Sequence, residues 1–66
     1  MTGARAGLGS RAEVAEYLRV PVSTLDRWAR LGTGPRYARV GRHARYRWSD
    51  VETWLLERTR RAGRET

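Results

Sequence analysis

The first apolar stripe along the chain predicts a short helix near the N-terminus. Val14, Ala15 and Leu18 recur at helical spacing. Ser10 precedes them with a glutamate three residues later, which is the pattern of an N-terminal capping box. The helix should end near Arg19, because the proline two positions later disfavours helical backbone in the residue before it. Its charged residues are expected to face water: Arg11, Glu13 and Glu16.

A second helix is predicted over residues 22–31, because Gly32 follows as a natural stop. Leu25, Trp28 and Ala29 form its apolar stripe. The other face carries small polar groups and then guanidinium groups: Ser23, Thr24, Arg27 and Arg30. Two short helices joined by a tight turn, the second with a polar and basic outer face, are typical of a helix-turn-helix unit whose recognition helix enters the major groove.

The next segment is predicted to form a β-hairpin. Residues 37–40 and 45–48 are short β-prone runs, and the four residues between them include a glycine. If Val40 and Tyr46 point into the core, the alternation of side chains along a strand directs arginines outward, with Arg42 at the tip. The outward arginines are then Arg39, Arg45 and Arg47.

A third short helix is predicted to begin at Ser49, which forms a second capping-box pattern with Glu52. Its apolar stripe consists of Val51, Trp54 and Leu55. Trp48 precedes this helix and leaves two interpretations open. Its ring either packs over the start of the helix or remains partly exposed as a contact for a neighbouring copy or another protein.

These elements predict one mainly α-helical domain over residues 8–58, with three short helices and a two-stranded hairpin, between flexible tails at residues 1–7 and 59–66. So short a chain buries only about 60% of the surface that it exposes when unfolded, so the core must be small. The residues expected to fill it are Val14, Leu18, Val20, Leu25, Trp28, Val40, Tyr46, Val51, Trp54 and Leu55.

The distribution of charge along the chain indicates what kind of partner this domain binds. All 14 basic residues are arginine, against seven acids, which gives a formal net charge of +7. The segment from Arg27 to Arg47 holds seven arginines and no acid, whereas residues 49–57 hold three acids and no base. A basic surface attracts phosphates and releases their counterions on binding, so this distribution favours a nucleic-acid partner.

Other classes of function are disfavoured by what the chain lacks. It has no cysteine and one histidine, His43, so it cannot build a tetrahedral zinc site within one chain. His43, Arg45 and Tyr46 invite comparison with tyrosine recombinases, but those active sites need a far larger domain, and Tyr46 is better used in the core. No apolar run approaches the ~20 residues that cross a bilayer. We therefore expect a cytoplasmic protein that is not an enzyme, with no cofactor, small-molecule ligand or membrane contact.

Several short motifs, in one order and at one spacing, carry a family resemblance over roughly residues 8–57. They are Glu13-Val-Ala-Glu-Tyr-Leu18, Val20-Pro-Val-Ser-Thr-Leu25 with Arg27-Trp28, Val40-Gly-Arg42, Arg45-Tyr46, and Ser49-Asp-Val51 ending in Trp54-Leu55. In these motifs the chain resembles the excisionase and AlpA-type helix-turn-helix domains, relatives of the MerR winged-helix group. The resemblance implies a winged helix-turn-helix that binds double-stranded DNA with its second helix in the major groove and its hairpin, the wing, against the neighbouring minor groove or backbone.

The resemblance also implies which residues meet DNA. Arg45 stands before the wing tyrosine, where such proteins commonly hold a phosphate. Asp26 departs from the pattern: it either accepts from a cytosine amino group or pairs with Arg30 four residues later, which the helical spacing favours. The contacts implied by position are Ser23, Thr24, Arg27 and Arg30 on the recognition helix and Arg42 and Arg45 on the wing. The arginine-lined hairpin adds Arg39, His43 and Arg47 to the expected wing contacts.

Three functions remain open. The resemblance favours an excisionase, a recombination directionality factor of a phage or mobile element, in which several copies bind adjacent repeats near an attachment site, bend the DNA and assist an integrase. A small AlpA- or MerR-like transcriptional regulator would use the same contacts. A DNA-packaging adaptor of the terminase small subunit type is less favoured, because 66 residues leave little room for a partner-binding module.

Overall fold

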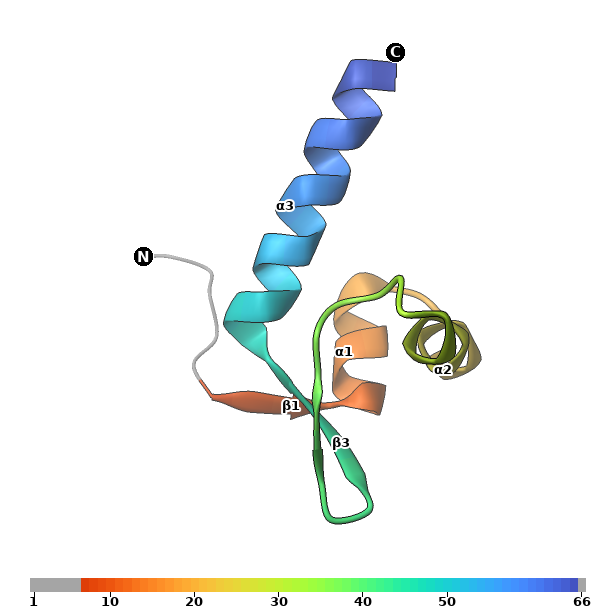
Figure 1. Cartoon of the computed structure of the whole chain (residues 1–66), viewed down its shortest axis with the longest axis vertical. Coiled ribbons are helices and arrows are strands. Elements are labelled where there is room, and N and C mark those ends of the chain that lie inside the picture. Colours follow the sequence, from red (N-terminus) through yellow and green to blue (C-terminus); the bar gives the residue numbers. More distant parts are fainter. Residues whose placement is uncertain (1–6, 66) are drawn as a thin grey trace.

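The structure, a computed structural model, describes residues 7–65, with the backbone alone for residues 64 and 65, and shows three helices and a small antiparallel sheet (Figure 1). The elements in chain order are β1 (Leu8–Ser10), α1 (Arg11–Leu18), α2 (Val22–Leu31), β2 (Ala38–Val40), β3 (His43–Arg47) and α3 (Trp48–Glu65). This arrangement confirms the predicted mainly α-helical winged helix-turn-helix. Apart from Gly7, the predicted N-terminal tail lies outside the described residues.

The two helices of the helix-turn-helix unit begin and end where local signals place them. The Ser10 hydroxyl accepts from the backbone N–H of Glu13 at 3.1 Å, and the Glu13 carboxylate accepts from the Ser10 N–H at 2.8 Å. This is the predicted capping box. Helix α1 ends at Leu18, and the N–H of its cap residue Arg19 donates to the carbonyls of Ala15 and Glu16. The left-handed backbone of Arg19 (φ 61°) then turns the next N–H, that of Val20, back to the Ala15 carbonyl at 3.0 Å. The chain then turns directly into α2.

The sheet has three strands in the order β1-β3-β2, one more than the hairpin predicted from the sequence. The added strand β1 pairs with β3, with Gly9 opposite Tyr46. A side chain at position 9 would have no room, because a Cβ there would lie 2.7 Å from Cε2 of the Trp48 ring and closer still to Cζ2. Glycine at this position therefore allows the indole to lie against the strand.

The hairpin turn is shorter than predicted, with two residues rather than four. Val40 pairs with His43, so the turn consists of Gly41 and Arg42. Gly41 has φ +64° and Arg42 has no positive φ, and a positive φ at the first turn residue alone is the mark of a type II′ turn, which favours glycine there. Because opposed residues share a face of the sheet, Val40 lies on the face of His43 and away from Tyr46. The expectation that Val40 points into the core was wrong, and its side chain is 54% exposed.

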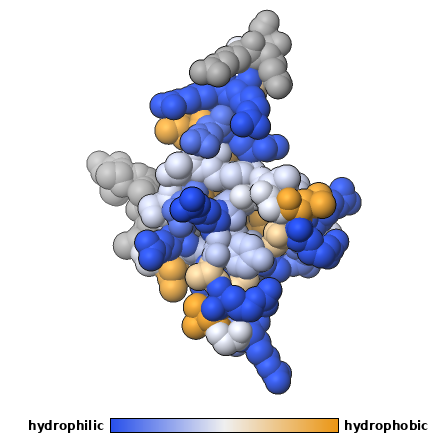
Figure 2. All heavy atoms as spheres, viewed as in Figure 1, coloured by the Kyte–Doolittle hydropathy of each residue, from blue (hydrophilic) through white to orange (hydrophobic). Residues whose placement is uncertain are grey.

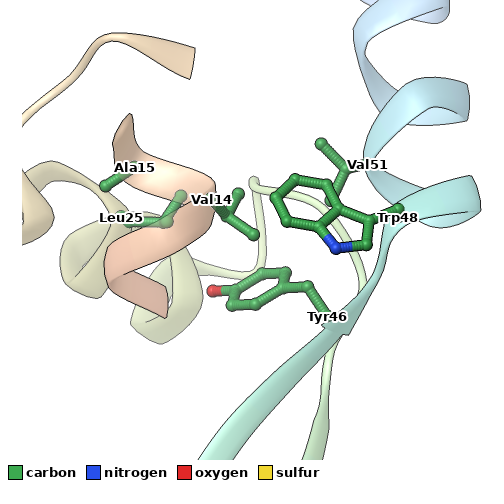
Figure 3. Packing of buried hydrophobic residues seen from close by; sticks show 6 residues of the cluster. All are labelled: Val14, Ala15, Leu25, Tyr46, Trp48 and Val51. Carbon is green, nitrogen blue, oxygen red and sulfur yellow. The ribbon is translucent and has the colours of Figure 1, made fainter. Parts of the chain in front are cut away.

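Six side chains form the buried core, where α1, α2, β3 and the start of α3 meet (Figure 3). They are Val14, Ala15, Leu25, Tyr46, Trp48 and Val51. The Trp48 ring packs edge-on against Tyr17, with ring centroids 5.5 Å apart, so of its two interpretations the structure shows the packed one. The predicted core residues Leu18, Val20 and Trp28 are partly buried against this cluster.

Helix α3 differs from its prediction at both ends. It begins at Trp48, so Ser49 lies inside the helix rather than capping it, and Glu52 accepts a hydrogen bond from the Tyr17 hydroxyl. It continues to Glu65, through residues of the segment 59–66 that the sequence suggested as a tail, and projects from the body of the molecule (Figure 1). Leu55, which was expected in the core, is 37% exposed on it.

Trp54 joins α3 to the end of α2 rather than to the buried core. Its ring stacks at a tilt on Trp28, with centroids 5.4 Å apart, and its indole N–H donates to the carbonyl of Thr33 at 3.0 Å. The partly buried indole is thus anchored at both its apolar and its polar end, as is usual for tryptophan.

The packing of Trp48 on β1 generates a stability prediction. Gly9→Ala is expected to lower the free energy of unfolding by about 1–3 kcal/mol, as overpacking typically does, because the new methyl group collides with the indole. Urea denaturation followed by tryptophan fluorescence measures this change. Gly63→Ala is the control for the change itself: a Cβ there meets nothing within 4 Å, and inside helix α3 alanine should raise rather than lower stability. Equal stability of the parent and Gly9→Ala would contradict this packing.

Candidate nucleic-acid interface

The outer face of α2 presents the polar and basic side chains that the sequence assigned to DNA. Ser23, Arg27 and Arg30 are exposed, and Thr24 is half-buried. The first helical hydrogen bond is donated by the Thr24 N–H to the Pro21 carbonyl at 3.0 Å. The N–H groups before it point out of the helix start, where a phosphate is favoured by the helix dipole. This face can therefore offer both side chains and backbone to a DNA strand.

The acid on this helix has a different partner from the one expected. Asp26 accepts from Nη1 of Arg11 on α1 at 2.9 Å, an ion pair between side chains that are 45% and 22% exposed, respectively. The expected pair between Asp26 and Arg30 was therefore wrong. Within the described part of the chain no carboxylate pairs with Arg30, which leaves its guanidinium available to DNA.

Arg11 also contacts the sheet. Its Nε donates to the Tyr46 hydroxyl at 3.2 Å, and its guanidinium carbon lies 5.0 Å from the centroid of the Tyr37 ring and 6.0 Å from that of Tyr46. Burial opposes its charge, but the hydrogen bonds to Tyr46 and Asp26 outweigh burial, so the pKa of Arg11 is raised above its ordinary value. Arg11 was expected to face water, and that expectation was wrong.

One signal in the sequence pointed to a special role for Arg11. It is the first residue of α1, where a cation is disfavoured by the positive end of the helix dipole. An arginine at this position therefore needs compensation from elsewhere in the fold. Its partners lie 15 and 35 residues away, which is why helical spacing could not identify them.

The wing presents its basic residues on two faces and a tip. Arg42 is exposed in the turn, and His43, Arg45 and Arg47 alternate along one face of β3. Arg39 is opposite Ala44, so it lies on the other face of the sheet, and the expectation that it shares a face with Arg45 and Arg47 was wrong. All five predicted wing contacts stay at the surface, although Arg45 is half-buried and donates to the Ala44 carbonyl at 2.9 Å.

A shallow hollow on the outer face of the sheet contains a further arginine that was not among the predicted DNA contacts. Three arginines line it together with one acid and three uncharged residues: Arg36, Arg45, Arg47, Asp50, Leu8, Tyr37 and Ala38. In the space-filling view, strongly hydrophilic side chains lie at the hairpin end of the molecule beside a smaller hydrophobic patch (Figure 2). The wing and its base thus form a broad guanidinium-rich surface, which suits the phosphate backbone of a duplex.

The comparison with protein families agrees with this geometry. A family model described as a helix-turn-helix domain matches residues 10–59, which is most of the chain. The chain belongs to this helix-turn-helix family. The family comprises small DNA-binding domains of the excisionase and AlpA type, so membership supports DNA binding and confirms the resemblance at this level. A comparison with curated protein sequences finds no match.

The structure describes the side chains of residues 7–63. Among these residues no three histidine, aspartate or glutamate side chains gather where they could ligate a metal ion. No helix in the same part of the chain has the length and apolar character needed to cross a membrane.

The exposure of Arg27 on the recognition helix predicts a role in reading bases. Arg27→Ala is expected to cost about 1–3 kcal/mol of binding free energy on the preferred site and to relax sequence preference, as the loss of a bidentate contact to guanine does. Fluorescence anisotropy with specific and random duplexes measures both effects. An equal loss on the two duplexes would refute base reading by Arg27.

Arg45 on the wing is expected to behave differently. Arg45→Ala should weaken binding to all sequences alike and lower the slope of log affinity against log salt by about one, because one phosphate contact is lost. The same anisotropy titrations at four salt concentrations measure the slope. A selective loss on the preferred site, with an unchanged slope, would show that Arg45 does not hold a phosphate.

Proposed function

We propose that this helix-turn-helix protein is an excisionase-type DNA-binding protein without catalytic activity of its own. Several copies bind adjacent repeats near an attachment site, bend the DNA and assist a separate integrase in excision. The observation that carries the DNA-binding step is the acid-free run from Arg27 to Arg47, whose seven arginines occupy α2, the wing and the loop between them. These elements are the parts of a winged helix-turn-helix that meet adjacent grooves.

The burial of Tyr46 supports a role without catalysis. Its side chain is 1% exposed, and its hydroxyl accepts a hydrogen bond from Arg11. A nucleophilic tyrosine has to reach the phosphodiester that it attacks. Tyr46 instead lies under the wing, so the nearby His43 and Arg45 have no reactive group to assist.

The surface of α3 favours an excisionase over a regulator that dimerises through a coiled coil. Such a dimer needs apolar residues that recur every three to four positions along the joining helix. Beyond Leu56, the described positions of α3 offer no such stripe: Glu57, Arg58, Thr59, Arg60, Arg61, Ala62 and Gly63. Copies of this protein are therefore expected to meet on DNA, where neighbouring sites hold them side by side.

Bending of the DNA costs free energy, which protein contacts have to offset. Curving a site of 20 to 30 base pairs by 40 to 90 degrees costs on the order of 1 to 6 kcal/mol. Arginine contacts from both the recognition helix and the wing, together with contacts between adjacent copies, would offset this cost. Cooperative binding is thus a consequence of the proposal.

A gel-shift titration tests the excisionase proposal. The probes are DNA from around the protein's own gene, including the flanking attachment site, the promoter region alone, and random DNA of equal length. Discrete cooperative shifts on the attachment site are expected, with mobility that depends on the position of the site within the fragment, because a bend retards a fragment most when it is central. Purified integrase should then excise only when the protein is added.

The other outcomes decide between the remaining functions. Tight binding confined to the promoter would replace the proposal with a small AlpA- or MerR-like regulator. Equal affinity for all three probes would leave a basic domain without sequence preference and would overturn the proposal.

A further inference from the structure

The guanidinium of Arg11 joins the two DNA-contacting elements through a single side chain. From the first residue of α1 it reaches Asp26 on α2 at 2.9 Å and the Tyr46 hydroxyl on β3 at 3.2 Å. We propose that Arg11 is a positioning residue for DNA recognition, which neutralises Asp26 beside the DNA and fixes the recognition helix relative to the wing without contacting DNA itself. This inference rests on DNA binding by the two elements and not on the excisionase role.

Two of the three guanidinium nitrogens of Arg11 donate hydrogen bonds within the fold, and the third is buried. Nε and Nη1 donate to Tyr46 and Asp26, and Nη2 is buried with no hydrogen-bond partner among the described residues. The rings of Tyr37 and Tyr46 lie within 6.0 Å of the guanidinium carbon. The group is therefore held on several sides, and the one nitrogen without a hydrogen-bond partner, Nη2, is buried away from a phosphate.

Asp26 is placed where its charge matters to DNA. On a helix, residue 26 is a neighbour of residue 23 and residue 30, so its carboxylate borders the surface that Ser23 and Arg30 present. Its side chain is 45% exposed. Without Arg11 an uncompensated negative charge would stand next to the phosphate backbone, and like charges brought together at an interface weaken binding.

The contacts of Arg11 with the two tyrosines fix the position of α2 relative to the wing. Tyr46 lies between Arg45 and Arg47 on β3, and its ring stacks on Tyr37, with centroids 5.4 Å apart, just before β2 begins. Arg11 thus ties α2 to β3 and to Tyr37, the residue just before β2. A helix in one groove and a wing in the next can bind together only if the distance between them is fixed. Contact residues that are already held in place lose less conformational entropy on binding than flexible ones.

The test uses Arg11→Met, which keeps an apolar stem beside the tyrosine rings but removes the charge and the donors. It is combined with Asp26→Asn, alone and in the double variant. Arg60→Met, on the projecting part of α3, is the matched control for the loss of one positive charge. The duplex is whichever one the parent protein prefers, and thermal unfolding by circular dichroism confirms that each variant is folded at the assay temperature.

Arg11→Met is expected to weaken binding to the preferred duplex about tenfold, the effect of one uncompensated charge, with the salt slope unchanged. Asp26→Asn in the same background should recover about threefold of that loss, because it removes the stranded carboxylate. The control should bind as the parent does. If Arg11 only stabilised the fold, removing the charge of Asp26 would not restore DNA binding.

Three results would overturn the proposal. A folded Arg11→Met that binds as the parent does shows that the arrangement is irrelevant to DNA. A salt slope lowered by about one shows that Arg11 is itself a phosphate contact. No recovery in the double variant shows that Asp26 does not act through Arg11.

Arg11→Lys replaces Arg11→Met if the latter is unfolded, since it keeps a charge for Asp26. It should then bind more weakly than the parent, and Asp26→Asn should bring no recovery because no carboxylate is stranded. If the parent itself binds no duplex, the proposed function fails rather than this inference.

Discussion

The structure depends on one guanidinium held between a carboxylate and two tyrosine rings. Six buried side chains are a small core for a chain of 66 residues, and Tyr46, one of the two large aromatic residues among them, carries a hydroxyl into it. Arg11 satisfies that hydroxyl and the exposed acid of α2 together. A partly exposed ion pair adds only about 1 kcal/mol to stability. Its larger effect is to specify one orientation of α2 against the sheet, which apolar packing alone would define less sharply.

The parts of the fold that local chemistry determines could be predicted from the sequence. The Ser10 capping box, the span of α2 and its stop at Gly32 are set by residues within a few positions of one another, and the structure confirms them. Strand β1 could not be predicted, because its three residues become a strand only by pairing with β3, nearly 40 positions later. The start of α3 was missed by one residue, because burial of Trp48 against Gly9 draws that residue into the helix start, whereas Glu52 is engaged by Tyr17.

For the candidate site, the sequence predicted which side chains point outward from α2 more securely than which face of the hairpin each side chain occupies. The outer face of α2 follows from the 3.6-residue period, so Ser23, Arg27 and Arg30 are exposed as expected. On the hairpin every side chain changes face with a shift of one residue, and the turn length sets that register. The two-residue turn at Gly41 places Val40 and Arg39 on the faces opposite to those expected. The Arg11 contacts were missed because they are made by three elements that only the tertiary fold brings together.

The availability of the arginines follows from where the acids are used. Glu13 closes the cap of α1, Glu52 accepts from Tyr17, and Asp26 accepts from Arg11, so three carboxylates near the body of the domain are engaged in holding it together. In the described part of the chain no carboxylate is paired with Arg27, Arg42 or Arg47. Unpaired, exposed guanidinium groups attract a polyanion at long range and lose no internal partner on binding it. Because these carboxylates are engaged inside the domain, the arginines of its recognition helix and wing are left free to bind DNA.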